Sequence, residues 1–414
     1  MMKVLWFECT TPGRYKSGEV LGGWQDSLET IVKDFPEIEL TIAFEADEHL
    51  EERRIDGVRY IPIRLCYTRQ EKKQAEVSWE VGAEKMLNAM EQIVKDVQPN
   101  LIHVFGTEWA FGLIAERTDI PVVIHIQGAI VAYNNALYPP RYSVFDVIRN
   151  EGLRHPISMY KAWKRYKHEL SREDIERRVW NAVGNYMGRT EWDKALSAIM
   201  HPGRRYFHVE EALRPVFLNC DNCWHFPDDG KIRLISTGII SFRKGIDMML
   251  KTAEILMSLN VSFEWHVAGV LPYDMKQMVE RKEGRQFDNC NIIVHGFLPS
   301  DKVWKLLSES TIYVHTAYAE NSPNSICEAQ CLGIPVVSTN VGGISSLVQD
   351  GVDGILVPAN DPWYMAYQII QLSSDVQKMQ EFSVRARERA LERHSKDNIT
   401  KELRNCYNTI CKDL

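Results

Sequence analysis

The sequence predicts an α/β protein made of two domains, each built around a parallel β-sheet. The first observation is the length of 414 residues, which is enough for two domains of roughly 100–200 residues each. The second is that short β-like runs alternate with helical patterns almost throughout, as in successive βαβ units. The third is a break at 214–231, which contains two prolines and Asp-Asp-Gly and has no clear periodicity.

The expected strands are short and mostly apolar, as buried parallel strands should be. In the first half, we expect strands at 3–7, 39–44, 101–105, 122–126 and 181–184. In the second half, we expect strands at 233–237, 263–268, 291–294, 312–315, 336–338 and 355–357. Helices are expected between them at 82–97, 248–259 and 302–308, and along 361–414.

Composition and charge indicate an ordinary soluble protein. Hydrophobic residues make up 45% and charged residues 25% of the chain. The net charge of −7 argues against a surface devoted to nucleic acid. The first seven residues lack the length, basic region and cleavage site of a signal peptide. No apolar run approaches the ~20 residues of a membrane-spanning helix, so we expect a cytoplasmic protein.

The nine cysteines suit free thiols in a reducing compartment, because their number is odd and they are scattered. Cys220 and Cys223, with His225 nearby, resemble half of a zinc site. A structural zinc site needs four ligands, and no second pair of that type exists. A turn with free thiols is therefore the favoured interpretation, and no metal site is expected.

The segment with the most chemistry follows the expected strand at 312–315. A loop carrying Pro323 leads into a helix that begins near Ser325. Ligands of open α/β sheets bind beyond the carboxyl ends of the strands, and a helix N-terminus offers N–H groups to phosphate or sugar oxygens. Asn324 and Ser325 are therefore candidate binding residues. Glu320 and Glu328 can accept hydrogen bonds from sugar hydroxyls, although Ser325 and Glu328 also fit a capping box.

Basic and glycine-rich loops add a second group of candidates. Arg243 and Lys244 lie where a strand passes into a helix and can bind a diphosphate. A solvated basic pair would give the same pattern. Two glycine pairs let backbone amides approach phosphate oxygens closely, unless they form plain turns. These pairs are Gly22 with Gly23, and Gly342 with Gly343.

Together these motifs resemble the glycosyltransferases of the GT-B fold, specifically glycosyltransferase family 4, over nearly the whole chain. The strongest part is the E-x7-E motif from Glu320 to Glu328, followed by Gly333 and Pro335-Val-Val. The resemblance implies two facing Rossmann-like domains with a cleft between them. Residues 1–215, completed by a helix at about 395–414, would bind the acceptor, and 216–394 would bind the nucleotide-sugar donor.

The resemblance also assigns roles to individual residues. Glu328 would bind the donor ribose, Glu320 the donor sugar and Lys244 the diphosphate. His125 matches the histidine that faces the donor sugar in this family, so His125, Glu320 and Lys244 form the expected catalytic set. A satisfied core histidine is the alternative for His125. Ile239 stands where the family usually has arginine, so either Arg243 takes over that role from the other end of the loop or donor binding is weakened.

The reaction implied by the resemblance is sugar transfer with retention of the anomeric configuration and without a metal. The chain contains no Asp-x-Asp triplet, so fixed positive charge must stabilise the leaving diphosphate. We expect a UDP- or GDP-linked sugar as co-substrate and no other cofactor. The product would be part of a surface polysaccharide or glycoconjugate.

The acceptor is expected to be a glycan or a lipid-linked glycan. The segment 154–168 has five basic residues, no acidic ones, and three aromatic residues. Such a segment can attach peripherally to an anionic membrane surface on its inner face, or it can be a solvated helix face.

There are three alternative functions, and the first two require sequence motifs that can be checked directly. A nicotinamide-dependent dehydrogenase needs Gly-x-Gly-x-x-Gly, and the chain has no Gly-x-Gly. A P-loop kinase needs a lysine where Glu19 follows the glycines at 13 and 18. A catalytically inactive sugar-binding protein of the GT-B fold stays open, because fold does not fix function.

Overall fold

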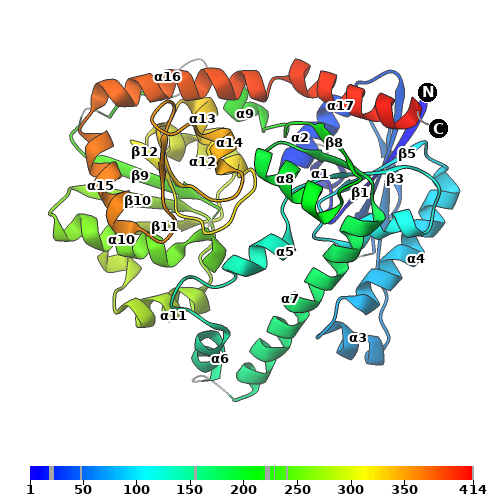
Figure 1. Cartoon of the computed structure of the whole chain (residues 1–414), viewed down its shortest axis with the longest axis horizontal. Coiled ribbons are helices and arrows are strands. Elements are labelled where there is room, and N and C mark those ends of the chain that lie inside the picture. The colour runs from blue at the N-terminus through cyan, green and yellow to red at the C-terminus, as the bar shows by residue number, and fades with distance from the viewer. Residues whose placement is uncertain are drawn as a thin grey trace. The chain divides into compact units, whose positions relative to one another are not determined.

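The computed structural model describes residues 1–17, 23–46, 49–152, 156–219, 224–227, 229–238 and 241–412. These residues form two compact units (Figure 1). Unit 1 comprises 1–132, 160–212 and 394–414, and unit 2 comprises 133–159 and 213–393. The segment 133–159 therefore belongs with unit 2, whereas the sequence predicts it within the first domain, 1–215.

Unit 1 contains an eight-stranded sheet in the order β3-β4-β2-β1-β5-β6-β7-β8. All neighbours are parallel except β3 and β4, which form an antiparallel pair at one edge. The strands are β1 (Met2–Glu8), β2 (Ile38–Glu45), β3 (Arg53–Ile55), β4 (Val58–Ile63), β5 (Leu101–Phe105), β6 (Val122–His125), β7 (Asn185–Gly188) and β8 (Arg205–His208).

Helices cover both faces of this sheet. Alternate side chains of a strand point to opposite faces, and accordingly Val4 and Trp6 join one apolar cluster while Leu5 and Phe7 join another. The first cluster includes residues of α2 (Trp24–Val32) and α17 (Lys396–Lys412). The second includes residues of α4 (Glu80–Val97), η1 (Ala110–Glu116) and α7 (Pro156–Ala182).

Helix α17 brings the end of the described chain back to the first strand (Figure 1). Its Tyr407 hydroxyl accepts a hydrogen bond from Trp6 Nε1 at 3.1 Å and lies 2.6 Å from His103 Nδ1. Burial lowers the pKa of His103 to about 3, so the ring is neutral, and its Nδ1 shares a hydrogen bond with the Tyr407 hydroxyl. One side chain of α17 thus connects β1 to β5.

Unit 2 contains a six-stranded parallel sheet in the order β11-β10-β9-β12-β13-β14. Helix α10 (Ile246–Ser258) packs against α15 (Pro362–Ser373), and α13 (Asn324–Leu332) packs against α16 (Val376–Arg393). The strands are β9 (Ile232–Thr237), β10 (Phe263–Ala268), β11 (Ile292–Gly296), β12 (Ile312–His315), β13 (Val336–Thr339) and β14 (Ile355–Val357).

The remaining helices are short, and most connect the strands. They are α1 (Gly13–Ser17), α3 (Arg69–Ala75), α5 (Ile130–Tyr133), η2 (Asn134–Ala136), α6 (Val144–Gly152), α8 (Glu191–Met200), α9 (Pro215–Leu218), η3 (Phe242–Lys244), α11 (Tyr273–Glu283), η4 (Phe287–Asn289), α12 (Ser300–Ser308) and α14 (Ile344–Leu347). In the described ranges, no helix combines the length and apolarity required to cross a bilayer.

One expected strand is wrong. Residues 181–184 do not form a strand, because α7 continues to Ala182 and β7 begins only at Asn185. The side chain of Asn181 donates to the carbonyl of Arg177 at 3.0 Å, as is common near helix ends. The polar end of the helix therefore occupies the first two of the four positions that were expected to form the strand.

Candidate functional site

Three loops at the carboxyl end of the unit 2 sheet meet around Glu320. They follow β9, β12 and β13, and two glycines permit their approach. A Cβ at Gly245 would lie 1.8 Å from the carbonyl oxygen of Thr316, and a Cβ at Gly342 would lie 1.7 Å from that of Glu320. Both glycines also have positive φ, +71° and +53°, which disfavours any side chain. Glycine is therefore required at both positions.

Hydrogen bonds tie these loops together. Tyr318 N–H donates to the carbonyl of Arg243 at 2.7 Å, and Thr316 Oγ1 donates to that of Lys244 at 2.8 Å. Gly343 N–H donates to the carbonyl of Glu320 at 3.1 Å. The basic pair and the first glutamate of the motif, 76 positions apart in the sequence, are thus held in one rigid arrangement.

The buried carboxylate of Glu320 forms ion pairs with both basic residues. Lys244 Nζ contacts Glu320 Oε1, and Arg243 Nη1 lies 3.5 Å from the same oxygen. Arg243 also donates to the carbonyl of Ala319 at 3.0 Å, and its guanidinium lies 4.2 Å from the ring centroid of Tyr133. Arg243 is therefore positioned by three groups within unit 2.

These contacts leave an excess of positive charge. Burial alone would raise the pKa of Glu320, but Lys244 and Arg243 lower it below its ordinary value. Burial, with Lys244 nearby, lowers the pKa of His315 to about 3. At neutral pH, the site contains a neutral imidazole, one carboxylate and two cations. Its net charge of about +1 favours an anionic ligand.

Glu328 does not cap its helix. Its helix α13 begins at Asn324, so Glu328 is the fifth residue, and the described N-cap has no side-chain hydrogen bond. Instead, Glu328 Oε1 accepts hydrogen bonds from Arg214 Nε at 2.9 Å and Nη2 at 2.7 Å. Burial raises the pKa of Glu328, and Arg214 opposes that shift. The capping-box alternative is wrong, and Glu328 is held by an arginine far away in sequence.

The predicted histidine of unit 1 is fully buried at the end of β6. His125 Nε2–H donates to the carbonyl of Val209 at 3.1 Å, which leaves Nδ1 without a hydrogen-bond partner among the described residues. The ring of Trp24 lies edge-on, with a centroid distance of 4.8 Å. Burial, and then Arg189, lowers the pKa of His125 well below its ordinary value. The ring is neutral, and its role at a donor sugar stays a prediction.

The other predicted residues are placed as follows. Gly23 precedes α2, and Asn324 and Ser325 are the first residues of α13. Gly342 and Gly343 precede α14. Gly22, Ile239, Cys220 and Cys223 lie outside the described residues.

Three residues of the site, Arg214, His315 and Tyr133, were not predicted from the sequence. Arg214 lies in the segment expected to be a linker, and no pattern connects it to Glu328, 114 positions later. His315 was expected only as a strand end, yet that position alone placed it at the carboxyl edge where the loops converge. Tyr133 has no local signal.

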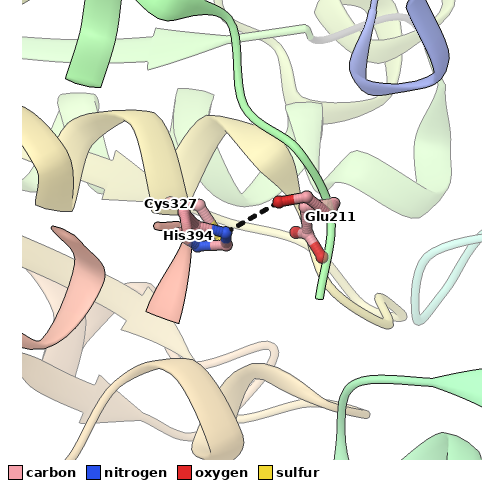
Figure 2. A group of neighbouring side chains, drawn as sticks. All are labelled: Glu211, Cys327 and His394. Atoms are coloured by element: carbon pink, nitrogen blue, oxygen red, sulfur yellow. Dashed lines mark hydrogen bonds between the residues drawn. The ribbon is translucent and has the colours of Figure 1, made fainter. Parts of the chain in front are cut away.

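Figure 2 draws three residues of types that can bind a metal, Glu211, Cys327 and His394. His394 Nδ1 donates to the backbone carbonyl of Glu211 at 2.9 Å, within unit 1. The carboxylate of Glu211 pairs with Arg189 Nε at 2.8 Å. Cys327, also drawn, belongs to unit 2. These contacts of Glu211 and His394 are those of a structural connection, and the absence of a metal from the function stays a prediction.

Comparison with known proteins gives a family match within the second half of the chain. Residues 225–389 match the family described as glycosyl transferases group 1. The putative colanic acid biosynthesis glycosyltransferase WcaL of Salmonella typhimurium is 27% identical over 189 residues, 43% of this chain and 45% of that protein. Poly(ribitol-phosphate) alpha-N-acetylglucosaminyltransferase of Staphylococcus aureus is 25% identical, over 40% of this chain and 33% of that protein. The match thus spans less than half of each relative.

Solved structures resemble the whole chain. Sucrose-phosphate synthase from Thermosynechococcus elongatus has a TM-score of 0.75 at 14% identity and covers 100% of both chains. Anabaena HepE, in complex with UDP-glucose, has a TM-score of 0.66 at 15% identity, over 99% of this chain and 100% of that one. The expected GT-B fold class and the resemblance to group 1 glycosyltransferases are confirmed.

Proposed function

We propose that this chain, whose residues 225–389 match the group 1 glycosyltransferases, transfers a sugar from a nucleotide-sugar donor to a glycan or lipid-linked glycan. Unit 2 would bind the donor. The observation that carries the proposal is the excess positive charge at Glu320, where Lys244 and Arg243 share one carboxylate. A nucleoside diphosphate is an anion that such a site attracts.

The groups around Glu320 and Glu328 suit the parts of that donor. Lys244 and Arg243 would bind the diphosphate and stabilise the charge that develops as it leaves. Glu320 would accept hydrogen bonds from the donor sugar, and Glu328, fixed by Arg214, from the ribose. The first N–H groups of α13, at Asn324 and Ser325, would add donors at a helix N-terminus.

Transfer would proceed with retention and without a metal. In this mechanism, an acceptor hydroxyl attacks the anomeric carbon from the face that the diphosphate leaves. The new bond joins the acceptor oxygen to the anomeric carbon, and the bond from that carbon to the phosphate oxygen breaks. The departing phosphate oxygen takes the hydroxyl proton. The glutamates bind substrate rather than acting as the acid and nucleophile of a hydrolase.

The test is a thermal-shift series with UDP, GDP, ADP, dTDP and CMP on the wild type, on Glu328→Ala, and on Glu388→Ala as a matched control. Glu388 is an exposed carboxylate on α16 of the same unit. A ligand at about a hundred times its Kd adds ~2.7 kcal/mol to stability. We expect a shift with one nucleotide, retained in the control and lost in Glu328→Ala. No shift with any nucleotide contradicts the proposal, and binding without transfer or donor hydrolysis identifies an inactive sugar-binding protein.

We also propose that the protein works in the cytoplasm, attached peripherally to an anionic membrane through α7. Ile157, Tyr160 and Trp163 are exposed on this helix. The rings of Tyr160 and Trp163 are stacked, with their centroids 6.1 Å apart. Lys161 lies between Tyr160 and Trp163, and Lys164, Arg165 and Lys167 follow along the helix, a composition typical of interfacial helices. Sedimentation with anionic vesicles at low salt tests this, and Trp163→Glu should reduce binding. Equal binding by the two proteins would contradict the role of α7.

A further inference from the structure

A cavity of about 170 Å³ lies at the carboxyl end of the unit 1 sheet. Its lining begins at Glu45, where β2 ends, and includes Trp109 and Phe111 after β5. Helices α4 and α7 contribute further walls, and all lining residues belong to unit 1. This is the edge of an open α/β sheet at which ligands bind, and no residue of the donor proposal lines it.

The size of the cavity suits one six-membered ring. An apolar cavity of about 150 Å³ holds a benzene molecule, so a volume of 170 Å³ holds one ring and little more. A nucleotide or a disaccharide would have to extend beyond it. The occupant is therefore a single cyclic unit, free or at the end of a longer molecule.

Two tryptophans of the lining are held rigidly. The rings of Trp79 and Trp109 lie 5.5 Å apart and are inclined at 45°. Trp79 Nε1–H donates to His168 Nδ1 at 3.2 Å. The guanidinium of Arg172 lies 4.5 Å from the ring centroid of Trp79 and 5.3 Å from that of Trp109. Aromatic side chains fixed in this way bind a ligand with little loss of conformational entropy.

The charges beside the cavity, one arginine and one carboxylate, balance and favour no ionic occupant. Arg172 already occupies the cation position at both indoles, so a second cation would meet like charge. An anion would meet the carboxylate of Glu45, which lines the cavity. Burial lowers the pKa of His168, so its ring is neutral at pH 7. The favoured ligand is therefore uncharged.

Polar groups distinguish a sugar from an apolar ring. Because His168 Nδ1 accepts from Trp79, the proton of its neutral ring is on Nε2, which is a donor. Tyr67 and Ser78, each with a hydroxyl, also line the cavity, and Glu45 contributes a carboxylate that can accept hydrogen bonds. A wall of indole and phenyl rings with a few donors and acceptors is suited to a pyranose, which has apolar C–H faces and hydroxyls around its rim.

We propose that this cavity binds one neutral pyranose ring of the acceptor. The inference rests on the proposed function and extends it, since it gives the acceptor class as a glycan that contains an uncharged sugar. Trp79 and Trp109 contact the ring faces, and Tyr67, His168 and Glu45 contact the hydroxyls.

The test uses saturation-transfer NMR with a panel of methyl pyranosides, at concentrations about tenfold above a millimolar Kd, and n-octanol as an apolar probe. The variant Gly82→Leu places a side chain in the cavity. A Cβ at Gly82 lies 3.2 Å from the Tyr67 hydroxyl, the movable end of a side chain, and leucine is favoured over glycine in a helix. Gln92→Leu, at an exposed position of the same helix, is the matched control.

We expect at least one methyl pyranoside to bind the wild type and the control, and to bind Gly82→Leu at least tenfold more weakly with an unchanged melting temperature. Trp109→Ala should give the same loss. Binding of n-octanol alone, binding of no pyranoside, or equal binding by Gly82→Leu would overturn the proposal. The nucleotide shifts report separately on unit 2. If the nucleotide shifts are absent while pyranosides still bind the cavity, the proposed transferase function is contradicted and the proposed sugar site is supported.

Discussion

The loops around Glu320 in unit 2 and the strand end at His125 in unit 1 both lie at the carboxyl ends of parallel strands, but they differ in charge. In unit 2, a buried carboxylate is surrounded by more positive than negative charge. In unit 1, His125 and His103 are buried, neutral and packed against aromatic rings. Two parallel sheets with strand ends of similar construction thus favour different ligands. The strand ends of unit 2 carry excess positive charge that favours an anion, whereas the two histidines at the strand ends of unit 1 add no charge.

The largest expected effect comes from removing the charge at the centre of the unit 2 site. Glu320→Gln leaves Lys244 and Arg243 without their shared counter-ion and replaces one of the two acceptor oxygens offered to the donor sugar with an amide donor. Loss of one positioned group at a reacting centre costs about 10²–10³-fold in rate. We expect transfer to fall by this factor with little change in melting temperature. Near-normal transfer, with Glu388→Gln as the control, would remove Glu320 from the site.

A smaller effect, on the free energy of unfolding, is expected when the positive partner of Glu328 in unit 2 is removed. Arg214→Ala leaves Glu328 buried without its partner, and breaking such a pair costs about 3 kcal/mol of unfolding free energy, less here because Arg214 is partly exposed. Without the arginine, the pKa of Glu328 rises further. The cost should therefore grow as the pH rises from 5 to 8. Urea unfolding at both pH values measures it, and a cost independent of pH would contradict this account.

Unit 1 contains a buried carboxyl group, Glu176, whose pKa is raised, whereas the pKa of a typical salt-bridged carboxylate is lowered. Burial raises the pKa of Glu176 to about 7, although Thr107 and the N–H groups of Ile130 and Val131 donate to it. In the unfolded chain, this carboxyl has its ordinary pKa of 4.5 and loses its proton first. The free energy of unfolding therefore falls as the pH rises from about 4.5 to 7.

Glu176→Gln removes this titration while keeping an acceptor oxygen. Relative to the wild type, its unfolding free energy should rise by about 2–3 kcal/mol between pH 4.5 and pH 7.5, at 1.36 kcal/mol per unit of pKa. Denaturation curves at the two pH values give this difference. Glu173→Gln, on the same helix and paired with Arg177 near the surface, should show no such rise. Parallel curves for wild type and Glu176→Gln would contradict the raised pKa.

Much of the fold could be predicted because its central strands are continuous apolar runs. The strands at 101–105, 263–268, 312–315 and 355–357 have the expected bounds. The β3–β4 hairpin was missed, because β3 is only three residues long and β4 contains Pro62. Its turn has a signal that was available. Asp56 and Gly57 both have positive φ, and Asp-Gly is typical of such hairpin turns.

The candidate site could be predicted only where its residues lie in local motifs. Lys244, Glu320 and Glu328 stand out because each lies within about one helical turn of a helix start, in a segment that follows a strand. Arg214 contacts Glu328 across 114 positions, and no periodicity reports on such a pair. The burial of His125 depends on Trp24, about a hundred positions before it. Contacts of this kind arise from tertiary packing, which a linear pattern does not contain.

The return of α17 to the first strand has a consequence for biosynthesis. Chains emerge from the ribosome from the N-terminus, and domains fold as units. Tyr407 completes the contacts of Trp6 and His103 in unit 1, but it is made after every residue of unit 2, which ends at Arg393. The unit that starts the chain is thus the last to be finished. When residue 393 has just emerged from the ribosome, unit 2 has all of its residues, whereas unit 1 still lacks helix α17.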